Sequence, residues 1–228
     1  MSQTEPKISW PEVVRFIGQL NHDLRNHLNG IELQSAFLGE IVEQPEAKSE
    51  VVRLREITGE MGAHLQRLSS SLAKIRPATM PYQARDFVED LRAKLATGQP
   101  EQSAAMNWMV SLGEETIEID PQLLQEAFLE LIGNAFTHGR GEGALFFEAR
   151  SAGPAIEFVL REPKTKFEET TDDWGARPLT KLRHGHYALG LHRARSIFEA
   201  HHGSLQAQFD PAALVLTTTV ALPCSDGL

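Results

Sequence analysis

The sequence predicts an α+β protein in which a long antiparallel helical hairpin precedes a two-layer α/β sandwich. Apolar residues recur at helical spacing across residues 9–42 and 54–75, whereas short apolar strands alternate with helices from about residue 84. Strands and helices that alternate in this way usually form a mixed sheet with helices against one face. We therefore expect two domains, residues 1–80 and residues 81–228.

The whole-chain composition is that of a soluble globular protein, with 41% hydrophobic and 23% charged residues. A net charge of −9 without a basic stripe argues against a nucleic-acid partner. The single cysteine, Cys224, excludes an internal disulfide and suits a reducing compartment. Residues 1–7 lack the apolar core of a signal peptide, and no run approaches the roughly 20 apolar residues of a membrane span. We expect a cytoplasmic protein without a membrane partner.

The first predicted helix covers residues 9–42, with Ser9 as its N-cap and Pro11 in its first turn. Residues 44–48 interrupt the pattern and predict a turn. Pro77 and Pro81 end the second helix. Its apolar positions are Leu54, Ile57, Met61, Leu65, Leu68, Leu72 and Ile75.

These apolar positions form a narrow seam with coiled-coil spacing. A hairpin of two such helices has too little partner surface to be stable alone. Pairing two hairpins gives a four-helix bundle, so we expect a homodimer. The alternative is a helical hairpin that packs against the rest of its own chain.

One histidine stands opposite the apolar stripe of the first helix. With about 100° of rotation per residue, His22 points roughly 160–200° away from Leu20 and Leu24. A structural histidine would lie within the stripe, so His22 is presented to a partner. The stripe consists of Ile17, Leu20, Leu24, Leu28 and Ile31. The residues that share the His22 face are Gln19, Arg25, Asn26 and Asn29.

Residues 22–28, with the sequence HDLRNHL, resemble the phosphoacceptor motif of two-component sensor histidine kinases. The resemblance implies that His22 accepts a phosphoryl group and that Asp23 takes the proton from its ring. It also implies that Asn26 positions the water that removes phosphate from the partner. His27 stands where the family usually has proline.

The implied partner is the receiver domain of a response regulator. Its expected contacts are the polar neighbours of the phosphoacceptor on the same helix face, Gln19, Arg25 and Asn29.

The second domain is predicted element by element from residue 84 onward. Asp120 caps the longest of its helices, and residues 162–185 form an irregular polar segment long enough to be a lid. The predicted helices are 84–97, 121–138 and 187–201, and the predicted strands are 106–112, 116–119, 144–150, 155–161, 204–210 and 213–222.

The helix after Asp120 carries a second motif, Glu130-Leu-Ile-Gly-Asn134-Ala. It resembles the Glu-Leu-x-x-Asn-Ala element shared by histidine kinases, gyrase, Hsp90-type chaperones and mismatch-repair ATPases. The resemblance implies a sandwich of the histidine kinase/Hsp90-like ATPase type. It assigns Mg²⁺ to Asn134 and nucleotide contacts to Glu130, Asn134, His138 and Gly190. The alternative is a helix end capped by Gly139 with two solvated polar groups.

Two other elements depart from the family pattern. His186 and Ala188 replace glycines that let backbone approach phosphates, so that only Gly190 remains. The family's Asp-x-Gly-x-Gly turn, whose aspartate binds adenine, is missing. Glu162 can stand in for that acceptor, but Pro163 and Lys164 cannot form the glycine turn. Residues 168–173 are also acidic, which repels a triphosphate. Binding of Mg·ATP as a cofactor is therefore doubtful.

The favoured interpretation is a histidine phosphotransferase that exchanges phosphate between His22 and receiver aspartates without ATP. The first alternative is a soluble ATP-dependent histidine kinase core. The second is a non-catalytic pseudokinase scaffold that binds a response regulator. A metal site built from His22 and Asp23 with His27, His138 or His186 lacks the paired spacing of zinc ligands.

Overall fold

The computed structural model describes residues 9–168, 170–172, 174–176 and 189–225 of the 228-residue chain. The chain divides into two compact units, the first ending at Lys74 and the second beginning at Ile75.

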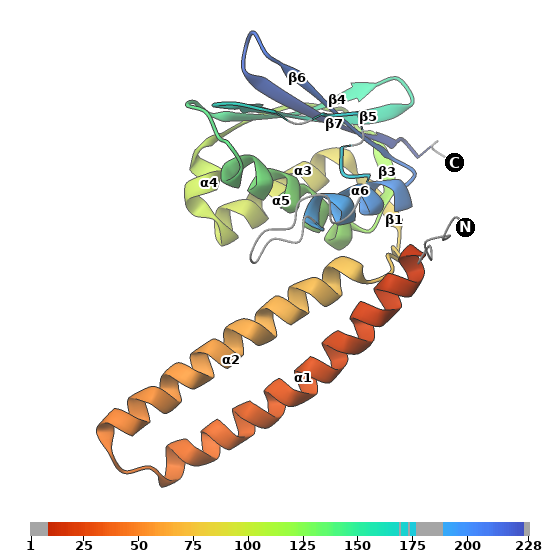
Figure 1. Cartoon of the computed structure of the whole chain (residues 1–228). Coiled ribbons are helices and arrows are strands. Elements are labelled where there is room, and N and C mark those ends of the chain that lie inside the picture. Colours follow the sequence, from red (N-terminus) through yellow and green to blue (C-terminus); the bar gives the residue numbers. More distant parts are fainter. Residues whose placement is uncertain (1–8, 169, 173, 177–188, 226–228) are drawn as a thin grey trace, which may run out of the picture. The chain divides into compact units, whose positions relative to one another are not determined.

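The first unit is a hairpin of two helices, α1 (Trp10–Ile41) and α2 (Pro45–Leu72), which run side by side in opposite directions (Figure 1). The Glu12 carboxylate accepts hydrogen bonds from the backbone N–H and the hydroxyl of Ser9, at 2.9 and 2.7 Å. These bonds lower the pKa of Glu12, the side-chain bond contributing most. This reciprocal cap confirms the predicted start of the first helix.

The connection between the two helices is shorter than predicted. Residues 44–48 are not a turn, because Pro45 is the first residue of α2 and only residues 42–44 link the helices. Proline is favoured at a first helical position, where its missing N–H has no partner to lose. The end of α2 was also placed too late, since the helix stops at Leu72 and Ile75 lies beyond it.

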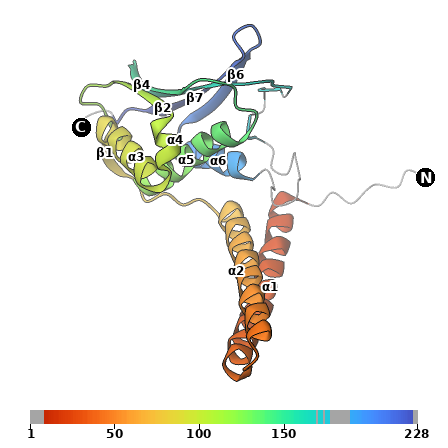
Figure 2. The same cartoon turned by 90° about the vertical axis from the view of Figure 1, so that its left-hand side faces the viewer.

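The second unit is a five-stranded sheet with its helices on one face (Figures 1 and 2). The strand order is β2-β4-β5-β7-β6, and only the β2–β4 pair is parallel. The five strands are β2 (Met106–Ser111), β4 (Leu145–Ala152), β5 (Ala155–Pro163), β6 (Ser204–Asp210) and β7 (Val215–Pro223). The helices are α3 (Ala84–Gly98), α4 (Pro100–Ala104), α5 (Pro121–Thr137) and α6 (Gly190–Ala200).

A separate two-stranded sheet joins β1 (Met80–Gln83) to β3 (Thr116–Ile119). The sequence pattern did not predict β1, because Pro81 suggested a break. Proline is compatible with this short strand, since it pairs on one side only. The pattern also missed the single turn of α4. The fold class itself, a helical hairpin followed by a two-layer α/β sandwich, is confirmed.

Strand β5 extends two residues beyond its predicted end at Arg161. Glu162 and Pro163, which the pattern assigned to an irregular segment, continue the strand opposite β7. Pairing with β4 has already ended at Arg161, so Pro163 has a ladder neighbour on one side only. A proline is tolerated in such a position because no second neighbouring strand requires the backbone N–H that proline lacks.

Aromatic rings hold α5 and α6 against the sheet. Phe128 of α5 lies 5.1 Å from Phe158 of β5 and 5.1 Å from Phe198 of α6, measured between ring centroids. All three rings are buried. His201, at the end of α6, accepts a hydrogen bond at Nε2 from the backbone N–H of Asp120, at 3.0 Å. This packing fixes where the ends of α5 and α6 lie.

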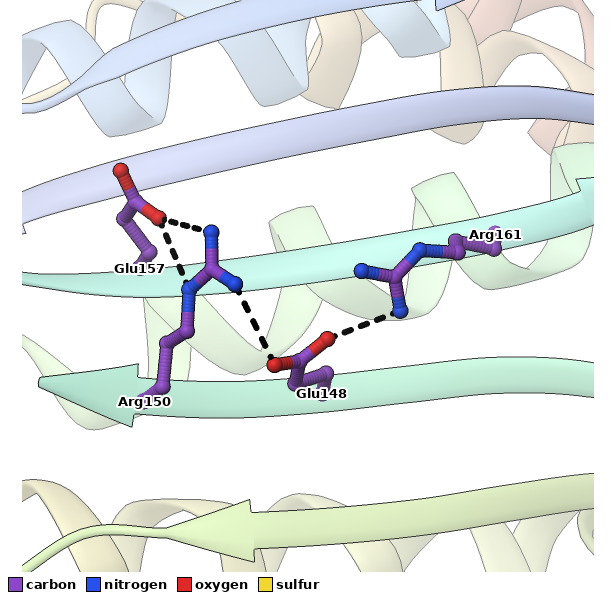
Figure 3. A network of polar contacts seen from close by, with 4 residues as sticks. All are labelled: Glu148, Arg150, Glu157 and Arg161. Carbon is purple, nitrogen blue, oxygen red and sulfur yellow. Dashed lines mark hydrogen bonds and ion pairs between the residues drawn. The ribbon is translucent and has the colours of Figure 1, made fainter.

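The other face of the sheet carries a polar network instead of helices (Figure 3). Glu148 of β4 lies between Arg150 and Arg161, with its carboxylate oxygens 3.4 and 2.8 Å from their guanidinium nitrogens. Arg150 also pairs with Glu157 at 2.7 Å. The charges of the four groups balance, so this face presents no field of one sign. In the part of the chain that the structure describes, no helix is long and apolar enough to cross a membrane.

Candidate functional site

The contact between α1 and α2 uses little of the apolar stripe of α1, of which only Leu28 is buried. The buried residues of α1 are Asn21, Leu28 and Ser35, at seven-residue intervals. By contrast, Leu24 and Ile31 keep 40% and 43% of their surface exposed in the single chain. Most of the stripe is therefore left uncovered beside the hairpin seam. The exposed apolar residues of α2 include Val52, Leu54, Ile57 and Met61.

His22 lies on the exposed side of α1, as predicted, with 68% of its side chain accessible. Its Nδ1 atom is 3.2 Å from Oδ1 of Asp23 and 3.4 Å from the amide nitrogen of Asn26. Gln19 donates a hydrogen bond of 2.9 Å to the same Asp23 oxygen. Four of the predicted site residues thus meet around one imidazole ring.

This arrangement selects one tautomer of His22. Asp23 accepts a hydrogen bond from Nδ1–H, which leaves the lone pair of Nε2 available. The Asn26 amide then fits best with its oxygen toward the ring, since a half-turn exchanges its two terminal atoms. Among the described residues, none makes a hydrogen bond to Nε2. The ring therefore presents an exposed nucleophilic nitrogen, with a carboxylate behind it.

The other two predicted receiver contacts, Asn29 and Arg25, differ in exposure. Asn29 is exposed on α1. Arg25 is half-buried, and its guanidinium donates a hydrogen bond to the side chain of Gln66 on α2. Arg25 thus ties the two helices together, one turn after Asn21.

The second group of predicted residues meets between α5 and α6. Asn134 donates a hydrogen bond of 3.2 Å to Glu130. A Cβ atom at Gly190, the first residue of α6, would overlap the Glu130 carboxyl group, so the two lie in direct contact. Burial of part of its surface raises the pKa of Glu130. A carboxylate therefore lies at the helix N-terminus where the family resemblance expects a phosphate.

His138, which was also predicted as a nucleotide contact, bonds to a neighbouring side chain through its backbone. It caps the C-terminus of α5, and its carbonyl oxygen accepts a hydrogen bond of 2.6 Å from Nζ of Lys164. The same Nζ lies 2.6 Å from Oε2 of Glu162. Only 6% of each of these two side chains is exposed. Burial raises the pKa of Glu162, against the opposing effect of the Lys164 charge.

Lys164 is a functional candidate that the motifs did not single out. Glu162 was expected to stand in for the adenine acceptor, but its carboxylate is already paired within the protein. The available signal was a lysine at a position where the family pattern has glycine. Gly141 also packs closely against Lys164, because a Cβ atom on residue 141 would come within 2.9 Å of the Lys164 backbone.

The described part of the expected lid is fastened to α6 and β6. The backbone oxygen of Trp174 accepts a hydrogen bond of 2.8 Å from the guanidinium group of Arg195. The backbone oxygen of Gly175 lies 3.0 Å from Nδ1 of His192. The predictions for His186 and Ala188 fall outside the described residues. Within the described residues, no group of three or more His, Cys, Asp or Glu side chains is arranged to hold a metal ion.

No family model and no curated protein matches this chain. Its structure is similar to full-length ShkA in complex with AMPPNP, with a TM-score of 0.69 and 17% identity over 93% of this chain. The chain spans 46% of the length of ShkA. It is also similar to the Acinetobacter baumannii histidine kinase AdeS, with a TM-score of 0.53 and 18% identity over 90% of this chain and 98% of AdeS.

A third match covers a smaller part of this chain. The mycobacterial sensor histidine kinase MprB gives a TM-score of 0.50 and 15% identity, over 64% of this chain and 98% of MprB. The chain thus has the fold of histidine kinase transmitter regions, a helical hairpin followed by an ATPase-type α/β domain.

Proposed function

We propose that this protein is a histidine phosphotransferase of two-component signalling, in which His22 exchanges a phosphoryl group with the aspartate of a response-regulator receiver domain. The observation that carries the proposal is the exposed His22 ring, with Asp23 at Nδ1 and no described partner at Nε2.

The transfer step is a nucleophilic displacement at phosphorus. The lone pair of His22 Nε2 attacks the aspartyl phosphate, an N–P bond forms, and the P–O bond to the receiver aspartate breaks. The aspartate leaves as a carboxylate, and the imidazole becomes positively charged. Asp23 stabilises this charge through Nδ1–H, as a carboxylate does for other reacting histidines. The reverse step phosphorylates a second receiver.

The residues around His22 have separate roles in the proposal. Gln19 and Asn29 contact the receiver, while Gln19 also orients Asp23 through its 2.9 Å hydrogen bond. Arg25 contributes to the same surface from its place beside Gln66. Asn26 positions a water molecule that removes phosphate from the receiver. The receiver supplies Mg²⁺.

The protein acts as a homodimer in which two hairpins form a four-helix bundle. The support is the uncovered stripe of α1, since Leu20, Leu24 and Ile31 are each at least 40% exposed in the single chain. A second hairpin that covers this stripe removes apolar surface from water and leaves His22 on the outside. The phosphoacceptor and dimerisation domain is residues 1–80, and the degenerate ATPase-like domain is residues 81–228. The single cysteine suits a cytoplasmic location.

The alternative is an ATP-dependent histidine kinase core. It is favoured by the contact between Glu130 and Asn134 and by the AMPPNP bound to ShkA. The paired Glu162 and Lys164 oppose it, because they occupy the end of β5 where an adenine acceptor is expected. Both alternatives use His22, and they differ in the source of the phosphate.

The proposal is tested by mixing the purified protein with receiver domains carrying labelled aspartyl phosphate. Label should move to the wild-type chain and to a His27→Ala variant, but not to a His22→Ala variant. His27 is a matched control because it is another exposed histidine of α1. Label on His22→Ala at the wild-type rate would refute the assignment.

A further inference from the structure

Asn21, the residue immediately before His22, connects the two helices of the hairpin. Its amide nitrogen donates a hydrogen bond of 2.8 Å to the backbone oxygen of Leu65 and another to the hydroxyl of Ser69. The residue is only 2% exposed. Its Oδ1 atom is buried with no hydrogen-bond partner among the described residues. One turn later, Arg25 makes a further side-chain bond across the same seam, and Arg55 of α2 pairs with Glu32 of α1 at the far end.

A buried asparagine is a costly choice for a helix contact. An unpaired buried carbonyl oxygen carries a desolvation penalty, and an apolar residue of similar size would avoid it. Polar residues in the contact between paired helices are best known for fixing one register against competing ones. The hairpin contains such a competing arrangement.

In the competing arrangement, the apolar stripe of α1 would face α2. On a helix with about 100° per residue, Leu24, Ile31 and Leu20 lie roughly 60–100° to one side of Asn21, and His22 lies about 100° to the other. Turning α1 by about 80° would bury these apolar residues against α2. That rotation would displace the Cα atom of His22 by about 3 Å on a cylinder of 2.3 Å radius. After this rotation, the apolar stripe would no longer be available for contact with a second hairpin.

We propose that Asn21 is a positioning residue for phosphoryl transfer, which locks the rotation of α1 against α2 and so aims His22 at the receiver. The inference rests on the proposed function of His22. In this role Asn21 excludes the arrangement with the more apolar seam, keeps Leu20, Leu24 and Ile31 free for the partner copy and keeps His22 on the opposite side. A displacement of about 1 Å at a reacting group can lower a rate about 100-fold, so a rotation of this size is sufficient to matter.

The test measures transfer from a phosphorylated receiver to wild type and to Asn21→Leu, over a range of receiver concentrations. The rate at saturating receiver should fall at least tenfold, while the half-saturating concentration stays within twofold. The variant should unfold at the same or a higher temperature than wild type. Ser69→Ala, which removes the acceptor on α2 without changing α1, should slow transfer in the same direction if Asn21→Leu does not fold.

Ser35→Ala is the matched control. Ser35 is buried in the same row of α1, but its hydroxyl bonds only to the backbone oxygen of Glu32 in its own helix. This variant should transfer phosphate at the wild-type rate. Transfer in folded Asn21→Leu or Ser69→Ala within twofold of wild type would overturn the proposal. So would a loss of rate in Ser35→Ala equal to the loss in Asn21→Leu.

A second measurement does not depend on activity. Gly30 of α1 and Gly59 of α2 suit cysteine substitution and spin labelling, because an added Cβ has nothing within 4 Å at either position. With Cys224 replaced by serine and excess unlabelled protein added, each labelled chain reports one distance. Asn21→Leu should shift that distance, and an unchanged distance would overturn the proposal. If wild type takes no label from any receiver, the proposed function fails, and this distance still decides the role of Asn21.

Discussion

Nζ of Lys164 lies 2.6 Å from Oε2 of Glu162 and 2.6 Å from the backbone oxygen of His138, and it joins the end of β5 to the end of α5. The ammonium group thus forms a buried ion pair with Glu162, the carboxylate that the family resemblance assigns to an adenine contact. In the proposed function, this carboxylate is paired within the protein.

Replacing Lys164 by methionine should destabilise the protein, because Glu162 would be left buried without its counter-charge. Breaking a buried pair from one side typically costs about 3–5 kcal/mol. Denaturant unfolding at pH 8 should show this loss. Because the matched Glu162→Gln/Lys164→Met double variant buries no charge, it should recover much of the stability.

The same variant should show a specific pH dependence. Burial already raises the pKa of Glu162 in the wild type, and loss of Lys164 should raise it further. A raised carboxyl pKa means that the folded state binds more protons than the unfolded state, so stability falls as the pH rises above about 4.5. The penalty of Lys164→Met should therefore be smaller at pH 5 than at pH 8. An equal penalty at both values would contradict this assignment.

The wild-type protein should not bind Mg·ATP or Mg·ADP with a Kd below about 1 mM, equivalent to about −4 kcal/mol. The physical reasons are the Glu162–Lys164 pair and the Glu130 carboxylate against Gly190. Isothermal titration calorimetry measures this directly. Micromolar binding would favour the kinase alternative, and loss of that binding in Asn134→Ala would locate it at α5.

Local sequence patterns predict the helices and strands well, but they predict the ends of these elements less accurately. The helix starts at Ser9 and Asp120 were recognisable because a carboxylate accepts a backbone N–H at each, Glu12 from Ser9 and Asp120 from Gln122. Pro45 and Pro163 were misplaced because proline marks a break in one context and a tolerated end position in another. For Pro163 the deciding factor is the pairing of β5 with β7, which joins residues far apart in the sequence.

The chain should be dimeric, with a mass twice the 25.3 kDa of the chain in light scattering. Changing Leu24 or Ile31 to glutamate should favour the monomer, since a charge in the proposed interface would be buried without a partner. Leu33→Glu is the matched control. Leu33 is 70% exposed and lies about 20° from His22 around α1, away from the proposed interface. A monomeric wild type at micromolar concentration would contradict the bundle.

Asp23→Asn should slow transfer to His22 by about 10- to 100-fold, because the amide keeps the shape but no longer stabilises a charged ring. Transfer kinetics from a phosphorylated receiver measure this effect. Glu40→Gln removes an exposed carboxylate from the same helix, far from His22, and should leave the rate unchanged. Equal rates in Asp23→Asn and wild type would remove Asp23 from the mechanism.

The phosphoacceptor face could be predicted from one helix, whereas the seam could not. Helical periodicity places His22 opposite Leu20 and Leu24 without any knowledge of the partner helix. That Asn21, rather than Leu24 or Ile31 of the apolar stripe, meets α2 depends on Leu65 and Ser69, more than forty residues away. The pairing of Lys164 with Glu162 was likewise hidden, because charged residues on either side of a proline are usually exposed.

The most direct measurement compares two phosphate donors on the same wild-type protein. Labelled ATP and a receiver carrying labelled aspartyl phosphate are supplied separately, and the labelled residue is mapped by mass spectrometry. We expect label from the receiver on His22 and none from ATP. Label from ATP on His22, with none from any receiver, would contradict it.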